Sequence, residues 1–179
     1  RGLGDVYKRQ RRVLLCDFDP QANSTSGMGV DKAASRGVYD VLINGADVTA
    51  SVAHTRYGDV LPSSKALAGA GIEMIDRENR EFLLKQALDI LSPNYDFILI
   101  DCPPSLGMIT LNALCAADGV LIPIQCEYFA LEGVSALMGT IQKVQKMNRH
   151  LAIEGVVLTM LDARTNLGVQ FAQLSLIHI

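Results

Sequence analysis

Five short apolar runs recur along the chain without the regular alternation of polar and apolar residues. They are VLLCD (13–17), DVLP (59–62), FILID (97–101), GVLIPI (119–124) and EGVVLT (154–159). A strand with one solvent-facing side alternates in polarity, whereas a strand of a parallel sheet is apolar on both faces because helices cover both. These runs therefore predict five strands of a buried, mostly parallel sheet.

Helical patterns lie between the apolar runs. Apolar residues spaced three and four positions apart predict helices over 37–45, 64–75, 78–91, 106–117 and 130–147. Asn44-Gly45 is a stop signal for the first helix, and Ser92-Pro93-Asn94 breaks the chain before the FILID strand. Strands that alternate with helices in this way predict an α/β fold with a doubly wound, mostly parallel sheet.

Composition narrows the class of protein. A chain of 179 residues with 49% apolar residues suits one domain with a substantial core. The net charge of −3 predicts no overall basic surface for nucleic acid or an anionic membrane. The four cysteines and three histidines show no metal-ligand spacing. Because no apolar run approaches the roughly 18 residues of a membrane span, and no signal peptide opens the chain, we expect a soluble, cytoplasmic protein.

Candidate chemistry lies where the predicted strands end. Asp17 and Asp19 end the first strand, Asp101 ends the third, and residues 159–162, which include Thr159 and Met160, end the fifth. Ligands of open α/β sheets bind beyond the carboxyl ends of the strands, so we expect these residues at one edge. An Asp after an apolar strand suits a site for Mg²⁺-bound phosphates, although such an Asp also commonly caps the next helix.

Two turns add detail to this edge. Pro20 excludes Asp19 from a helical conformation, so the Asp19 carboxylate is held at the edge, where it could orient an attacking water. Asp17 either supports a metal or is a buried acid that shapes the turn. The segment CPPSLG (102–107) predicts a stiff turn with backbone amides facing a phosphate, formed by Pro103, Pro104, Ser105 and Gly107. No glycine-rich phosphate loop precedes the first strand.

Several segments together resemble the ParA/Soj-type partition ATPases of the deviant Walker A class. The resemblance covers about residues 11–173 in order and spacing. The segments are LLCDFDPQANSTSGMG, GVYDVL, LPSS, YDFILIDCPPSLGMITLNAL, ADGVLIPIQCEYFALEGVSAL and EGVVLTMLDARTNLGVQ. The resemblance implies a P-loop NTPase-like fold, MgATP as ligand, slow ATP hydrolysis, an ATP-dependent homodimer and a role in chromosome or plasmid segregation.

The resemblance also implies roles for individual residues. Asp19 matches the second Asp of the Walker A′ motif, which positions the hydrolytic water, and Asp101 matches the Walker B Asp near Mg²⁺, with Asp17 as a further metal candidate. CPPSLG matches the switch that senses the γ-phosphate, a region to which we assign Thr159 and Met160 as well. The remaining candidates, near the nucleotide or the dimer contact, are Gln21, Glu127 and Tyr128.

Family members begin with a strand and a KGGVGKTT-like loop, which this sequence lacks before RVLLCDFDPQ. The resemblance therefore implies a partial nucleotide-binding domain over 11–173, truncated at both ends and inactive by itself. RGLGDVYKRQ (1–10) and LSLIHI (174–179) resemble translated sequencing adapters, so we interpret both as artefactual. The absent strand predicts unpaired sheet edges, with poor stability or aggregation as the result.

Partners follow from the resemblance alone. It implies a ParB-like partner protein, a nucleoid-associated location in the parent protein, and non-specific DNA contacts through a missing carboxyl-terminal part. It implies no membrane contact.

Other classes of protein fit less well. A MinD-like division-site ATPase is the nearest alternative, but CPPSLG and QCEYFALEG favour the Soj side. A receiver domain also pairs acids at strand ends, yet the chain between Asp19 and Asp101 is too long for that arrangement. Relatives of the nitrogenase iron protein would need cysteines that ligate an iron–sulfur cluster, and the positions of Cys102 and Cys126 do not support such a site. A scaffold without ATPase activity would have no need of Asp19 and Asp101.

Overall fold

The computed structural model describes residues 11–33, 36–125 and 130–160, and these residues form two units with separate sheets. The units are Arg1–Ala116 and Ala117–Ile179. The sequence predicted one domain with one sheet, so this division is a finding of the structure. The two terminal segments interpreted as artefactual lie outside the described residues, and that interpretation stays a prediction.

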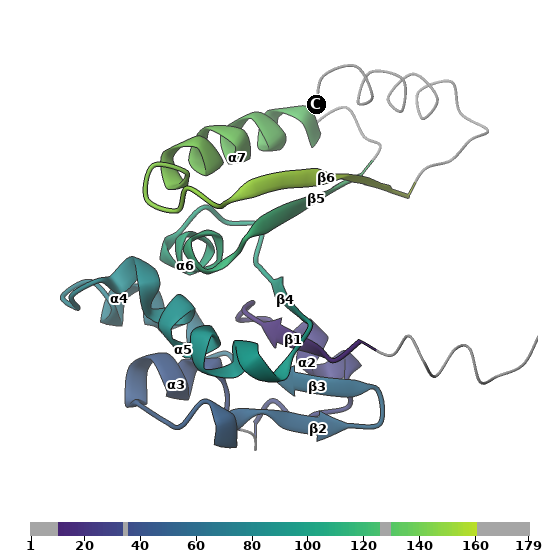
Figure 1. The fold of residues 1–179 in the computed structure, drawn as a ribbon, viewed down its shortest axis with the longest axis vertical. Helices are drawn as coiled ribbons and strands as arrows, with labels where there is room; N and C mark the ends of the chain where they lie inside the picture. Colours follow the sequence, from purple (N-terminus) through teal and green to yellow (C-terminus); the bar gives the residue numbers. More distant parts are fainter. Residues whose placement is uncertain (1–10, 34–35, 126–129, 161–179) are drawn as a thin grey trace, which may run out of the picture. The chain divides into compact units, whose positions relative to one another are not determined.

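The first unit contains a four-stranded sheet (Figure 1). Its strand order is β2-β3-β1-β4, with bounds Ala53–Thr55, Gly58–Leu61, Val13–Asp17 and Phe97–Asp101. β1 runs parallel to both β3 and β4, while β2 pairs antiparallel with β3. The predicted bounds of the first and third strands are confirmed, β3 begins one residue earlier than expected, and β2 was not predicted.

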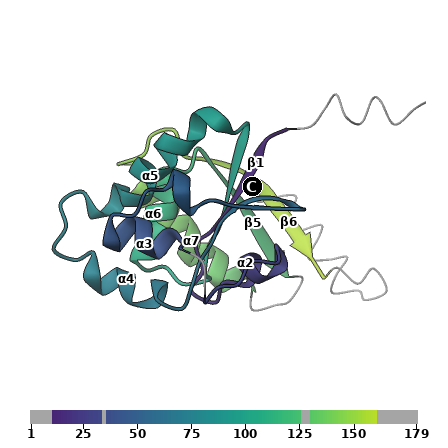
Figure 2. The ribbon, with the colours of Figure 1, turned by 90° about the horizontal axis from the view of Figure 1, so that it is seen from below.

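Helices cover one face of this sheet (Figure 2). The α-helices are α2 (Asn23–Gly27), α3 (Val38–Asn44), α4 (Leu67–Glu73), α5 (Leu83–Leu91) and α6 (Met108–Ala116). The 3-10 turns are η1 (Thr49–Ser51), η2 (Arg80–Phe82) and η3 (Ser92–Asn94). The predicted helices all form, with shorter bounds. The predicted stop after α3 is confirmed, because Gly45 takes a left-handed conformation with φ 70° that glycine adopts without strain.

The core lies between the covered face of the sheet and α3 to α6. Leu14 and Cys16 of β1 are fully buried, and Ile98 and Ile100 of β4 pack on the same cluster. Gly37, at the start of α3, lies so close to the Pro62 backbone that a Cβ would meet the Pro62 oxygen at 2.2 Å. The glycine thus allows α3 to dock on the loop that follows β3.

The second unit is a parallel strand pair with one helix. β5 (Gly119–Gln125) and β6 (Ala152–Thr159) pair in parallel, and α7 (Ala130–Val144) lies between them in the chain. Ile122 and Ile124 of β5 and Ile141 and Val144 of α7 are buried. A helix that connects two parallel strands is the crossover that the alternating pattern predicted.

In the first unit, the face of β4 that points away from α3 to α6 is exposed and apolar. Phe97 and Leu99 are 56% and 57% exposed, and Val13, which pairs with Phe97 across the strands, is 38% exposed. Within the described residues, β4 pairs with β1 alone. Within the first unit, no described element covers this second face, so the structure of this unit does not bear out the prediction that the strand is buried on both faces.

We expect the exposed apolar face of β4, on a strand at the edge of its sheet, to drive self-association. Replacing Leu99 by Lys should lower association, because a charge on an edge strand opposes pairing with another edge. Sedimentation velocity over a concentration series measures the effect, with the exposed Ile90→Lys on α5 as a matched control. Equal association of both variants and the parent chain would show that β4 is not the contact.

A polar cluster joins β2, β3 and the segment before β4. Nδ1 of His54 lies 2.6 Å from Oδ1 of Asp59, and the Tyr95 hydroxyl donates to Oδ2 of Asp59 at 2.8 Å. Partial burial raises the pKa of Asp59, but hydrogen bonds from His54 and Tyr95 outweigh burial and lower it overall. Burial and the bond to Asp59 raise the pKa of Tyr95 to about 12.

The raised pKa of Tyr95 predicts a stability contribution that is complete below pH ~10 and lost as the pH rises towards 12. Tyr95→Phe should cost about 1–2 kcal/mol of unfolding free energy at pH 7, since a bond to a charged acceptor is lost. Urea unfolding between pH 7 and 11 measures this, with the exposed Tyr57→Phe as control. A cost that does not shrink at high pH would contradict the assignment.

Candidate functional site

The register of β1 and β4 brings two carboxylates to one edge of the sheet. Asp17 lies opposite Asp101 at the carboxyl ends of the strands, and the amide of Phe18 donates to the Asp101 carbonyl at 2.8 Å. Burial, together with the nearby charges of Asp101 and Asp19, raises the pKa of the Cys102 thiol to about 12. The structure thus places Asp17, Asp19 and Asp101 at one edge, as the sequence predicted.

Asp17 is fully buried and its two carboxylate oxygens are both engaged. Oδ2 accepts hydrogen bonds from the backbone amide and the hydroxyl of Thr25, both at 2.6 Å. Oδ1 accepts from the amide of Asp19 at 3.2 Å. Of the two interpretations left open by the sequence, this geometry favours the acid that shapes the turn over a metal ligand.

Asp19 lies in a tight turn, and within the described part of the chain only one of its carboxylate oxygens accepts a hydrogen bond. Oδ1 accepts from the amide of Gln21 at 2.9 Å, and the Asp19 carbonyl accepts from the amide of Ala22 at 2.9 Å. Ala22 has φ 53°, a left-handed conformation that costs a non-glycine residue about 1–2 kcal/mol. Among the described residues no donor is assigned to Oδ2 of Asp19, so this oxygen is available to a water. Gln21 is exposed beside it.

Two hydroxyl residues of α2 connect the strand ends, and the sequence analysis did not identify them. The Ser24 hydroxyl donates to Oδ2 of Asp101 at 2.5 Å. Thr25 binds Asp17 and also accepts from the amide of Ser63, at 2.9 Å, in the loop after β3. The short helix therefore fixes the carboxylates of β1 and β4 relative to each other. The run NSTS directly after DPQA was the available signal.

The turn after β4 is largely solvent-accessible, and the prediction that its amides face a phosphate stays a prediction. Pro103 is half-buried, while Pro104, Ser105 and Gly107 are exposed. The Ser105 carbonyl accepts a short hydrogen bond from the Thr110 hydroxyl of α6, which fixes the turn to the helix. The turn leads directly from Asp101 into α6, so it lies next to the site.

Other predicted residues lie in the second unit or outside the described residues. Thr159 and Met160 end β6 in the second unit, where the Thr159 hydroxyl donates to the Ile124 carbonyl at 3.2 Å and Met160 is 80% exposed. The structure describes the two units individually and so does not join these residues to Asp19 or Asp101. Glu127 and Tyr128 lie outside the described residues.

The donor set suits a hard cation that keeps water or phosphate ligands. Across the described part of the chain, no three His, Cys, Asp or Glu side chains are placed to hold a metal together. Asp101 offers carboxylate oxygen at an accessible edge, and Mg²⁺ is commonly bound through one or two carboxylates plus phosphates and water. The residues present fit that mode of Mg²⁺ binding and do not form a complete cage.

Within the described ranges, no helix has the length and apolar character needed to cross a membrane.

Comparisons with known proteins match most of the chain. The profile of a family described as an AAA domain matches residues 5–153. The sporulation initiation inhibitor protein Soj of Bacillus subtilis is 56% identical over 164 residues, which cover 89% of this chain and 65% of that protein. The chromosome partitioning protein ParA of Myxococcus xanthus is 48% identical over 168 residues, covering 92% of this chain and 59% of that protein. The chain thus spans about 60% of the length of these relatives.

Solved structures match as well. Cobyrinic acid a,c-diamide synthase from Mycobacterium smegmatis, with an ATP analog and magnesium bound, is similar with a TM-score of 0.91 and 37% identity, over 97% of this chain and 72% of that chain. A plasmid partition protein from Borrelia burgdorferi is similar with a TM-score of 0.79 and 27% identity, over 95% of this chain and 74% of that chain.

Proposed function

Because this chain belongs to the ParA/Soj-type family of P-loop NTPases, we propose that it is part of an ATPase that binds MgATP and acts in DNA segregation. The predicted fold class and family are confirmed by these similarities. The proposal for ATP and Mg²⁺ is supported by the neighbour that holds an ATP analog and magnesium. The proposal for segregation is supported by the names of the relatives.

One observation carries the proposal: at this edge α2 binds Asp17, which holds the Asp19 turn, and also binds Asp101 of the neighbouring strand. We assign Asp101 to hold Mg²⁺, directly or through water, and Asp19 to orient the attacking water through its free Oδ2. The metal, when bound, neutralises charge on the phosphate oxygens. Asp17 and Thr25 hold the Asp19 turn, and Ser24 fixes the Asp101 carboxylate.

Finer properties of the whole protein belong to the same proposal. They are an ATP-dependent homodimer, a ParB-like partner, non-specific DNA contact and a cytoplasmic, nucleoid-associated location. Pro103 to Gly107, with Thr159 and Met160, are proposed to respond to the γ-phosphate, and Gln21, Glu127 and Tyr128 to lie near the nucleotide or the dimer contact. The names of the relatives support partition and do not favour a MinD-like role.

The 179-residue chain by itself should not hydrolyse ATP. Its sequence contains no G-x-x-x-x-G-K-[ST] run, and backbone amides and the lysine of such a loop supply most phosphate binding in this class. The acidic edge of Asp17, Asp19 and Asp101 repels the triphosphate when no such loop neutralises it.

Two proteins test the proposal. One is the 179-residue chain, and the other is a chimaera in which a strand and KGGVGKTT-type loop of a Soj relative precede Arg11. Phosphate release with MgATP should be absent for the 179-residue chain and measurable for the chimaera. If the parent protein acts in DNA segregation, added DNA should change the rate of phosphate release by the chimaera. A chimaera that folds, binds MgATP and yet never turns it over would overturn the ATPase assignment.

A further inference from the structure

The loop after α2 returns a lysine to the turn that carries Asp19. Nζ of Lys32 donates a hydrogen bond to the carbonyl oxygen of Gln21 at 2.8 Å. The amide of the same Gln21 donates to Oδ1 of Asp19 at 2.9 Å. Gln21 therefore connects the ammonium group of Lys32 to the carboxylate that we assign to the attacking water.

Local hydrogen bonds determine where this lysine lies. The amide of Val30 donates to the Thr25 carbonyl at 3.1 Å, so the loop begins folded against the end of α2. Oδ1 of Asp31 accepts from the amide of Ala33 at 2.9 Å, which closes a turn around Lys32. The backbone is thus held on both sides of Lys32, which is half-buried.

The turn that Lys32 contacts is strained. Ala22 has φ 53° and ψ 43°, a left-handed conformation that favours glycine over residues with a Cβ. The peptide group between Gln21 and Ala22 is bound at both ends, since its carbonyl accepts from Lys32 and its amide donates to the Asp19 carbonyl at 2.9 Å. Strained backbone persists where the surrounding contacts hold it, and Lys32 supplies one of these contacts from outside the turn.

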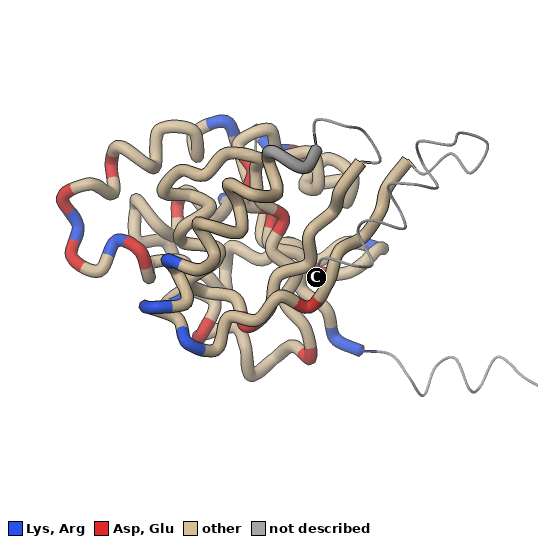
Figure 3. The backbone as a smooth tube through the Cα atoms, turned by 90° about the horizontal axis from the view of Figure 1, so that it is seen from above, with Lys and Arg blue, Asp and Glu red and all other residues tan. Residues whose placement is uncertain are grey.

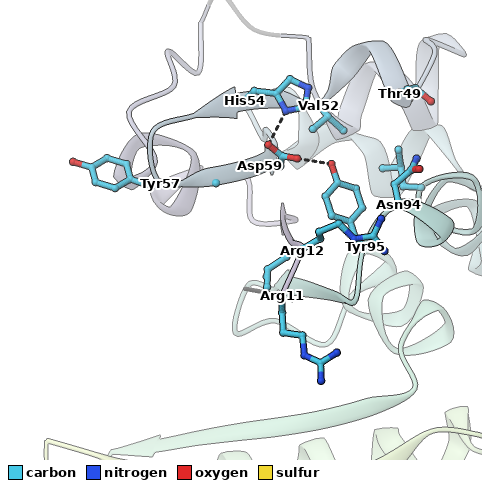
Figure 4. A pocket seen from close by; sticks show the side chains of 12 residues that line it. Arg11, Arg12, Thr49, Val52, His54, Tyr57, Asp59, Asn94 and Tyr95 are labelled. Atoms are coloured by element: carbon cyan, nitrogen blue, oxygen red, sulfur yellow. Dashed lines mark hydrogen bonds and ion pairs between the residues drawn. The ribbon is translucent and has the colours of Figure 1, made fainter. Parts of the chain in front are cut away.

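Several other cations of the first unit are bound away from this turn. Positive and negative residues are interspersed along the loops of the described chain (Figure 3). Arg11 and Arg12 lie at the amino ends of the strands, and the Arg11 side chain points away from Asp59 (Figure 4). The cations with partners elsewhere are Arg12 on Asp96, Arg77 on the carbonyls of Leu42 and Ile43, Arg80 on Glu81 and the Ile75 carbonyl, and Lys85 on Asp89. Among the described residues, Lys32 is the cation with an assigned bond to the Asp19 turn.

We propose that Lys32 is a positioning residue for ATP hydrolysis, which holds the strained peptide between Gln21 and Ala22 so that the Gln21 amide keeps the Asp19 carboxylate in place. The proposal rests on the ATPase function proposed above and adds a residue that the sequence analysis did not identify. An ammonium group suits this task because it is a compact charge with three donors on a flexible stem. Since water competes for a contact at the surface, the expected effect is moderate.

Lys32→Met in the loop-bearing chimaera is expected to lower kcat about fivefold and to change the KM for ATP by less than about twofold. Without the ammonium group the turn opens more often, so Asp19 is in place for a smaller fraction of the time. Lys65→Met is the matched control, because Lys65 is an exposed lysine of the same unit with no assigned partner among the described residues. A Lys32→Met variant with the parental kcat would overturn the proposal.

Two further variants separate a positioning role from a direct one. Lys32→Arg should restore kcat to within about twofold of the parent, because a guanidinium also donates to a carbonyl. Glycine adopts the left-handed conformation without strain, so in an Ala22→Gly background Lys32→Met should lower kcat by less than about twofold. An equal loss in both backgrounds would show that Lys32 acts other than through the turn, and would overturn the proposal.

Amide exchange of the 179-residue chain tests the contact without ATP. Lys32→Met should speed exchange of the Ala22 amide about fivefold, whereas Lys65→Met should leave it unchanged. Unchanged exchange in the Lys32 variant would overturn the proposal. A chimaera that never hydrolyses ATP would overturn the proposed function, and the exchange result would still decide whether Lys32 holds the turn.

Discussion

Asp19→Ala is expected to abolish ATP turnover in the loop-bearing chimaera while leaving ATP binding intact. Asp19 is half-buried, its Oδ1 is fixed by the Gln21 amide, and no donor among the described residues is assigned to its Oδ2, which can therefore accept from a water. Loss of a group that orients the attacking water costs on the order of 10²–10³-fold in rate. We assign the phosphate contacts to the added loop and to the metal at Asp101, so the affinity for MgATP should change by less than about threefold.

Single-turnover hydrolysis and nucleotide-binding fluorescence separate these effects. Asp76→Ala removes an exposed acid of the same unit and serves as the control, with no expected change in either measurement. Asp101→Ala should instead weaken the Mg²⁺ dependence of binding, because Asp101 is assigned to the metal. Hydrolysis by the Asp19 variant at the parental rate would show that another residue positions the water.

Thr25→Val is expected to have the largest effect on stability of any isosteric change in the first unit. The hydroxyl is fully buried, donates to Asp17 at 2.6 Å and accepts from the Ser63 amide at 2.9 Å. Its removal weakens the support of a buried carboxylate and leaves a buried amide unpaired. A lost bond to a charged group and an orphaned donor together cost about 3 kcal/mol.

Chemical denaturation of the 179-residue chain measures this cost. Thr49→Val removes an exposed hydroxyl of the same unit and should change the unfolding free energy by less than about 0.5 kcal/mol. Ser24→Ala is a further comparison, because it removes only the partly buried bond to Asp101. A Thr25 variant as stable as the Thr49 variant would show that the amide of Thr25 alone supports Asp17.

Much of the fold could be predicted because its signals are local. Runs such as VLLCD and FILID give the strand bounds, since unbroken apolar residues suit a parallel sheet and turn residues delimit them. Gly45 ends α3 because few other residues accept its left-handed conformation. The positions of Asp17, Asp19 and Asp101 at strand ends could be predicted from the same local signals. Parallel pairing of β1 and β4 then brings these residues to one edge of the sheet.

Elements held by distant partners could not be predicted. β2 has three residues and exists because it pairs with β3, and α2 is a five-residue helix of Asn, Ser, Thr and Gly, which are poor helix formers. Hydroxyl contacts of Ser24 and Thr25 to carboxylates on two strands hold α2 in place. The sequence shows these hydroxyls but not what they reach.

The sequence by itself determined the strands and helices other than β2 and α2, and which acids end the strands, because periodicity and turn chemistry are properties of neighbouring residues. Only the tertiary structure decided that Asp17 is buried and serves the turn while Asp19 keeps an oxygen free, since burial depends on which segments pack together. It also decided that Phe97 and Leu99 are exposed, because a strand's second face is covered only if another part of the protein reaches it.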